Sequence, residues 1–183
     1  TSKISANGLA GGSITTITRE KGQISGELVA RGEISAQSNT PNGRGGFVET
    51  SAAAVKIEND FIVNTGGGRW LIDPTDFTIG AGSGTQTISG IGATTLQTAL
   101  GSGSITIQTD ASPGGNGDIF VNAGVAWSSV HSLTLEAHRN IDVNANLTAS
   151  GTGTISLRAD GIGTDGVGKI RQGATSNAIS QAA

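Results

Sequence analysis

The stretch Gly45-Gly46-Phe47-Val48-Glu49-Thr50-Ser51, followed by Trp70-Leu71-Ile72-Asp73-Pro74-Thr75-Asp76-Phe77-Thr78-Ile79, decides the fold of this chain. Each half alternates apolar and polar residues, which is the pattern of a short strand with one face buried. The same alternation recurs downstream, for example in Ser104–Gln108, Asp118–Asn122 and Thr154–Arg158. The pattern therefore predicts an all-β chain with many short strands of one kind.

The spacing of these strands is more informative than the strands themselves. Ile119 and Ile141 are 22 residues apart, and so are Leu133 and Ile155. Comparable intervals of 22 or 23 residues separate Ile57 from Ile79, Ile34 from Ile57 and Val48 from Leu71. A repeat of this length is typical of a solenoid, in which each repeat is one coil. We expect a right-handed parallel β-helix of roughly 22 residues per coil and about eight coils, forming one segment over residues 1–183.

Composition agrees with this expectation and limits the partners. Gly accounts for 30 of 183 residues, and the apolar residues are mainly Ile, Val and Leu, so turns alternate with strand-forming runs. The net charge of −3 argues against a nucleic-acid-binding surface. Cysteine is absent, which removes disulfides and thiol chemistry. No apolar run approaches the length of a membrane span, so membrane insertion is not expected.

One segment departs from the strand pattern. Thr94–Gly101 has Leu96 and Leu100 at i and i+4, with a threonine to cap its start and a glycine to end it. It predicts a single helical turn. We expect further bulges out of the coil at residues 39–46, 80–87 and 110–117.

The quoted residues, taken in order, resemble the filamentous haemagglutinin-like exoproteins of two-partner secretion, a family of large bacterial adhesins and toxin-carrying filaments. The resemblance rests on Gly45–Ser51, Trp70–Ile79, Leu96–Leu100, Ser104–Thr109, Asn116–Asn122 and Leu133–Val143. It implies a right-handed β-helix within a secreted, surface-exposed filament linked to virulence. It also implies passage through a cognate outer-membrane transporter, using a secretion domain that is not evident in this sequence, so the chain looks like shaft sequence excised from a larger protein.

Three functions follow as hypotheses. The first is a structural and adhesive shaft segment, without catalysis or cofactor, that takes part in host-cell or cell–cell adhesion through a surface glycan or protein. The second is a carbohydrate-binding module that uses the bulging loops. The third is a polysaccharide-degrading β-helix enzyme, for which Asp73 and Asp76 are the candidate acids; Pro74 between them indicates a turn instead.

Few single residues suggest a binding site. Of the two tryptophans, Trp70 is expected in the core, and Trp127, beside two serines, is the better candidate for exposure and for ligand contact. Asn146 begins an Asn-Leu-Thr glycosylation sequon. The remaining expectations are that His131 and His138 do not bind a metal, that Asp160–Gly166 is a loop and not a calcium site, and that the four phenylalanines stack inside: Phe47, Phe61, Phe77 and Phe120.

Overall fold

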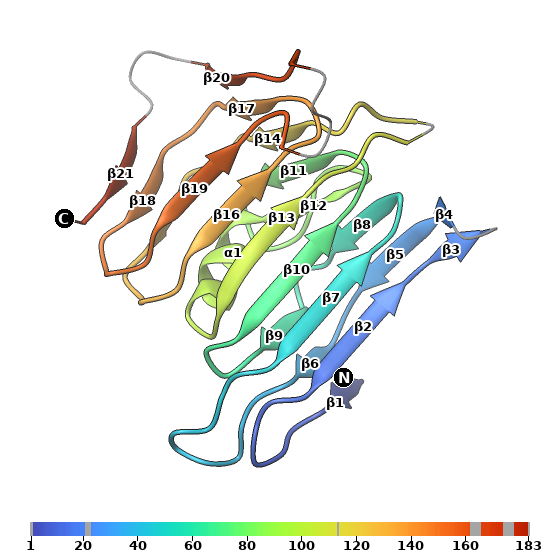
Figure 1. The fold of residues 1–183 in the computed structure, drawn as a ribbon. Helices are drawn as coiled ribbons and strands as arrows, with labels where there is room; N and C mark the ends of the chain where they lie inside the picture. The colour runs from blue at the N-terminus through green and yellow to red at the C-terminus, as the bar shows by residue number, and fades with distance from the viewer. Residues whose placement is uncertain (1, 21–22, 113, 162–165, 174–177, 183) are drawn as a thin grey trace.

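Short parallel strands follow one another around three faces of a right-handed coil, as the computed structural model shows (Figure 1). The structure describes residues 2–20, 23–112, 114–161, 166–173 and 178–182. Within these residues, every neighbouring pair of strands on the three faces is parallel. The predicted parallel β-helix is confirmed.

Most coils contribute a strand to each face, and along a face the strands lie in the following spatial order. The first face contains β1 (Lys3–Ser5), β6 (Glu33–Ser35) and β9 (Ile62–Asn64), then α1 (Ala93–Leu100), then β15 (Val125–Trp127), β18 (Leu147–Ala149) and β21 (Ile179–Gln181). The second face contains β2 (Ser13–Ile17), β7 (Phe47–Ser51), β10 (Arg69–Asp73), β13 (Ser104–Gln108), β16 (Leu133–Glu136) and β19 (Ile155–Arg158). The third face contains β5 (Glu27–Ala30), β8 (Ala54–Ile57), β12 (Gly90–Gly92), β11 (Phe77–Gly80), β14 (Ile119–Val121), β17 (Ile141–Val143) and β20 (Ile170–Gln172).

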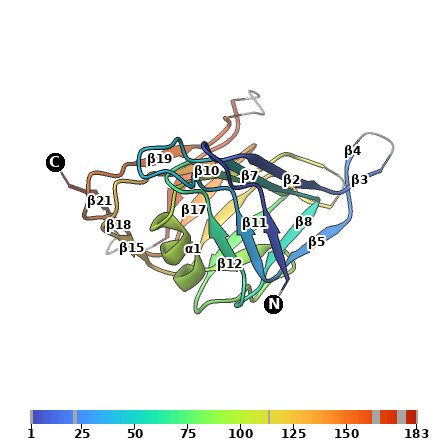
Figure 2. The ribbon, with the colours of Figure 1, turned by 90° about the horizontal axis from the view of Figure 1, so that it is seen from below.

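The coil length varies more than the sequence predicts. Leu133 pairs with Ile155 after 22 residues, but Ser13 pairs with Phe47 only after 34. Insertions between strands lengthen several coils, so the second face has six strands and the chain makes six coils, where even spacing predicts about eight. The insertions include residues 36–46, 81–89 and 109–118, which agree with the predicted bulges. A short hairpin of β3 (Arg19–Glu20) and β4 (Gln23–Ile24), which was not predicted, extends away from the body (Figure 2).

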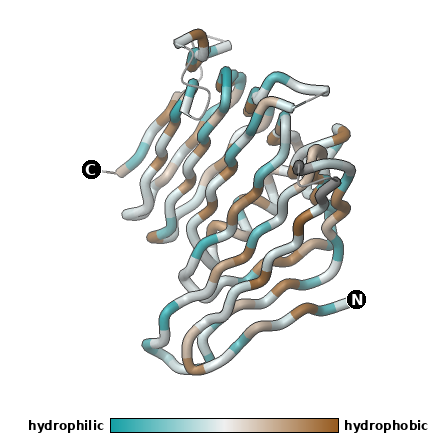
Figure 3. The backbone as a smooth tube through the Cα atoms, turned by 45° about the vertical axis from the view of Figure 1, so that its right-hand side comes forward, coloured by the Kyte–Doolittle hydropathy of each residue, from teal (hydrophilic) through white to brown (hydrophobic). Residues whose placement is uncertain are grey.

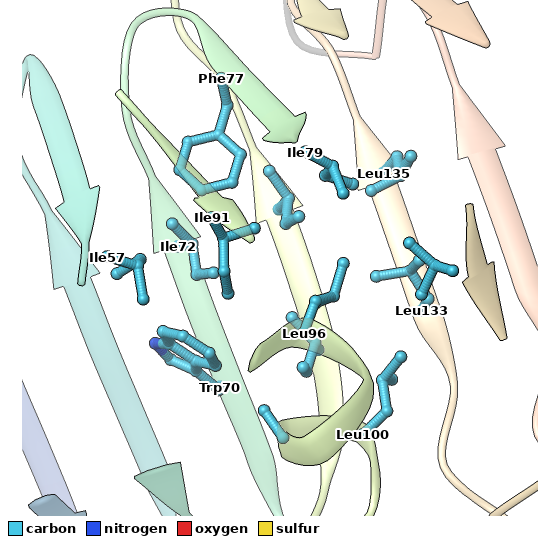
Figure 4. Close-up of a cluster of buried hydrophobic side chains, with 14 of the residues drawn as sticks. Ile57, Trp70, Ile72, Phe77, Ile79, Ile91, Leu96, Leu100, Leu133 and Leu135 are labelled. Carbon is cyan, nitrogen blue, oxygen red and sulfur yellow. The ribbon is translucent and has the colours of Figure 1, made fainter. Parts of the chain in front are cut away.

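Columns of apolar side chains fill the inside of the coil. Because side chains alternate along each strand, hydrophobic and hydrophilic residues alternate along the backbone (Figure 3). In-register pairing then places like residues above one another, as in the column of Trp70, Ile105 and Leu133 on the second face. One continuous core runs through the described coils, and Figure 4 shows its central part around α1.

The segment at 93–100 is a helix of two turns and not the single turn predicted. Leu96 and Leu100 are fully buried as expected, and they fill the first face between β9 and β15 (Figure 4). The predicted cap is wrong: Gly92 occupies the N-cap position without a side-chain hydrogen bond, and Gly101 at the other end has ordinary right-handed backbone angles. No helix among the described residues is long and apolar enough to cross a membrane.

Glycines form the corner between the first and second faces. Gly12, Gly46, Gly68 and Gly103 each come directly before a strand of the second face, and adjacent coils approach closely there. A Cβ atom on Gly68 would lie 1.9 Å from the backbone oxygen of Gly46, which no side chain tolerates. The corner is therefore tight because it has no side chains.

We predict that Ile107→Ala in the core lowers the free energy of unfolding by about 2–5 kcal/mol, because it leaves a cavity in a fully buried column. Urea unfolding followed by circular dichroism measures the change. The matched control is Thr106→Ala on the outer side of the same strand, which should change stability by less than about 0.5 kcal/mol. Equal losses in both variants would contradict the inside–outside assignment.

We predict that Gly68→Ala costs about 3 kcal/mol of stability, because the new methyl group forces two coils apart at the corner. Gly80→Ala is the control, since a Cβ atom at Gly80 meets nothing within 4 Å. Thermal unfolding of the two variants in parallel makes the comparison. A Gly68→Ala protein as stable as Gly80→Ala would show that the coils are not in close contact there.

Candidate functional site

A groove of about 370 Å³ opens on the outside of the coil near the turn between β10 and β11. Two of the insertions, residues 81–89 and 109–118, flank it. Its lining combines small apolar residues with hydroxyl groups and one carboxylate. The lining residues are Ala53, Ala54, Thr75, Asp76, Thr78, Thr87, Ile88, Ser89 and Gly114.

Asp76 connects the floor of the groove to one of its walls. Its Oδ1 accepts hydrogen bonds from the backbone N–H of Asn116 at 3.1 Å and of Asp118 at 2.8 Å. Nearby, the hydroxyl groups of Thr75 and Ser112 are hydrogen-bonded to each other. These contacts hold the 109–118 segment against the turn, so the orientation of the carboxylate is fixed.

The opposite wall is attached to the third face. The backbone N–H of Thr85 donates to the carbonyl of Ile57 at 3.0 Å, and Thr87 Oγ1 donates to the carbonyl of Ser89 at 2.7 Å. Ser89 Oγ in turn accepts from the backbone N–H of Val55 at 3.1 Å. Ile88, between these two anchored residues, is 77% exposed at the rim.

A ladder of polar side chains continues from Asp76 along the coil axis. Each of its members comes directly before a strand of the third face: Asp76, Asp118, Asn140 and Lys169. Asp118 Oδ1 accepts from the backbone N–H of Asn140 at 3.0 Å, and Asn140 Oδ1 accepts from that of Lys169 at 3.1 Å. One side-chain oxygen in each coil thus binds the backbone of the next coil at this corner.

Asp118 also forms a two-pronged ion pair. The guanidinium of Arg139 donates Nε to Oδ1 at 2.9 Å and Nη2 to Oδ2 at 2.5 Å, while Asp118 itself is buried. Burial on its own raises the pKa of the Asp118 carboxyl, but the hydrogen bonds from Arg139 and Asn140 and the Arg139 charge outweigh it. The pKa therefore lies below its ordinary value of 3.8, and the carboxylate stays charged.

The prediction that Trp127 is exposed is wrong. Val125 and Trp127 point inward from β15, and Trp127 is only 6% exposed. Its Nε1 donates to the carbonyl of His131 at 2.8 Å, so its polar atom is satisfied inside the protein. The strand alternation, which places residues 125 and 127 on the same side, decides this orientation over the two serines that follow. Trp127 has no open ring face for a ligand.

The other aromatic residues divide evenly. Phe61 and Phe77 are buried as predicted, but Phe47 and Phe120 are only partly buried on the outer sides of their strands, so the prediction for these two is wrong. The guanidinium of Arg69 lies 5.1 Å from the centre of the Phe47 ring. Trp70 is in the core as expected, and its Nε1 donates to Thr50 Oγ1.

The remaining candidates are separate from one another. Asp73 ends β10 in register with Ser51, whereas Asp76 binds the next loop, so the structure gives the two carboxylates different surroundings. His131 Nδ1 lies 2.9 Å from the carbonyl of Leu100, and His138 Nδ1 lies 3.5 Å from Asp110. In the described part of the chain, no three His, Asp or Glu side chains gather as a metal site would require.

Two sequence predictions fall at the end of the chain. Asn146 is partly buried, and its Oδ1 accepts the backbone N–H of Ala178 at 2.8 Å, which is the same kind of corner contact that Asn140 makes. Glycosylation of Asn146 stays a prediction. Of the Asp160–Gly166 loop, residues 162–165 lie outside the described residues.

The groove itself was only partly visible in the sequence. The flanking insertions were predicted, but the position of Asp76 at the turn between them depends on strand register. Comparison with protein-family models, curated proteins and solved structures finds no match to this chain. The geometry of the groove and of the coil is thus the basis for the function proposed below.

We predict that Asp118→Asn lowers the free energy of unfolding by about 1–3 kcal/mol near neutral pH, because a buried acceptor loses its charge while Arg139 keeps its own. The folded protein holds the Asp118 proton more weakly than the unfolded chain does. Its stabilising effect is therefore present above pH 3.8 and is lost as the pH falls below that value toward the lower folded-state pKa.

Urea unfolding at pH values of about 7 and about 2.5 tests this, since the difference between wild type and Asp118→Asn should narrow in acid. Asp142→Asn is the control, because its Arg171 partner is half exposed and such pairs contribute about 0–1 kcal/mol. A gap that stays constant with pH would contradict the role of the Asp118 charge.

Proposed function

We propose that this chain is a structural and adhesive segment of the shaft of a large, secreted bacterial surface filament. The observation that carries the proposal is the uninterrupted in-register stacking of coils along the second face, from β2 to β19. Such a stack buries its apolar residues between neighbouring coils and extends in one direction. Its stability comes from contacts along its axis, as a spacer requires.

Secretion and localisation at the cell surface belong to the same proposal. The resemblance to filamentous haemagglutinin-like exoproteins supports it, because the motifs of that family occur in order along residues 45–143. The lack of cysteine agrees with passage of an unfolded chain through an outer-membrane transporter. In this proposal that transporter is the partner during secretion, and a host glycan or surface protein is the partner afterwards.

A carbohydrate-binding role is the second candidate, and one observation favours it. The groove lies between two of the three loops from which sugar binding was predicted, and it contains a carboxylate and several hydroxyl groups. Polysaccharide cleavage has less support, because Asp76 is held by two backbone N–H groups and Asp73 lies in the strand before it. We therefore propose a segment that holds and binds but does not cleave.

We predict that the chain resists extension when it is pulled by its two termini in an optical trap or atomic force microscope. It should unfold in steps of whole coils, each regular coil of 22 residues releasing about 7–8 nm of extended chain. Ile107→Ala should lower the unfolding force and Thr106→Ala should not. Smooth extension without a force barrier would overturn the proposal of a load-bearing shaft.

A further inference from the structure

The groove beside Asp76 has the chemistry of a sugar site, and it goes beyond a plain shaft segment. We propose that it binds a neutral saccharide unit, one without sulfate or carboxylate groups. This inference rests on the proposed surface role of the segment, because it names the ligand class of the second candidate function. It assigns the contact to the Asp76 groove in place of Trp127, which is buried.

The size and rigidity of the groove suit a small ligand. Its volume of about 370 Å³ falls within the range of about 300–1,000 Å³ found for small-molecule sites. Both walls are attached to the coil, one through Asp76 and Asn116 and the other through Thr85 and Ile57. A site that is already ordered loses little conformational freedom when a ligand binds.

The polar groups match the hydroxyl groups of a sugar. Oδ1 of Asp76 already accepts two backbone hydrogen bonds, and no group of the described residues donates to its Oδ2. A fixed carboxylate oxygen is a strong acceptor for a sugar hydroxyl. Thr78 and Thr87 also line the groove, and a threonine hydroxyl can both donate and accept.

The apolar groups match the C–H face of a sugar ring. Ala53 and Ala54 line the groove, and the Ile88 side chain stands exposed at its rim. An isoleucine exposed to 77% between two anchored residues has no evident packing role of its own. Covering it with the carbon-rich side of a sugar would remove apolar surface from water.

Charge decides the class of sugar. Of the described residues that line the groove, Asp76 alone is charged. The guanidinium of Arg139, whose charge acts on Asp76, is paired with Asp118 and does not line the groove. A sulfated or uronic-acid sugar would therefore bring a second negative charge next to Asp76 without a cation in the groove to balance it.

An array of neutral, N-acetylated, sulfated and uronic-acid oligosaccharides, probed with the full chain, tests the proposal. We expect binding to neutral or N-acetylated glycans, and titration calorimetry with the best of these gives the affinity. Ile88→Asp and Thr78→Val should each weaken that affinity at least about tenfold, since a lost contact of this kind is worth about 1.4 kcal/mol. Thr106→Val, on the outer side of the second face, is the matched control and should leave it unchanged.

Asp76→Asn gives a second readout, because the amide oxygen can still accept the Asn116 and Asp118 N–H groups while the charge is lost. This variant should bind neutral glycans more weakly and should lose the discrimination against sulfated ones. Binding to sulfated or uronic-acid glycans alone, binding that Ile88→Asp and Thr78→Val leave unchanged, or no binding at all would each overturn the proposal. The force measurements on the shaft do not depend on any of these results, so the two proposals fail separately.

Discussion

Hydrogen bonding between each coil and the next is the constraint on which this structure depends. In a parallel ladder the backbone of one coil finds its partners only in the coils above and below, so strand, register and core are set together. A shift of one residue would turn every inward side chain outward. The pairing of Val48 with Trp70, and of Trp70 with Ile105, shows how strictly the register is kept even between residues of different size.

The corners of the coil meet this constraint by two different means. Between the first and second faces, glycines such as Gly46 and Gly68 let the backbones of adjacent coils touch. Before the third face, Asp76, Asp118 and Asn140 each use a side-chain oxygen to bind the backbone N–H of the following coil. The first device removes side chains and the second adds a polar one, and both keep backbone groups paired where the chain turns. The groove and its fixed carboxylate arise from the second device.

The architecture could be predicted from the sequence because its signals are local. Alternation identifies inward residues within one strand, and the 22-residue interval links Ile119 to Ile141 and Leu133 to Ile155, which are true neighbours. Other intervals misled. Val48 lies beside Trp70 and not Leu71, and Ile34 lies beside Val63, on a different face from Ile57. The site was harder to predict, because it depends on insertions whose paths are not periodic. The 81–92 segment returns to the sheet and places β12 between β8 and β11, which no interval in the sequence indicates. Asp76 was noticed as a possible acid, but its role as the anchor of a loop requires knowing that Asp118 follows it in the ladder.

The extra strand β12 also affects the shape of the molecule. The third face has seven strands where the second has six, and on the first face α1 occupies the level that β12 adds. One additional strand lengthens a face by about 4.8 Å, and a helix is wider still. Two sides of the stack are therefore taller than the remaining one, which makes this level a wedge. A filament containing such a wedge curves toward its second face at a defined point along its length.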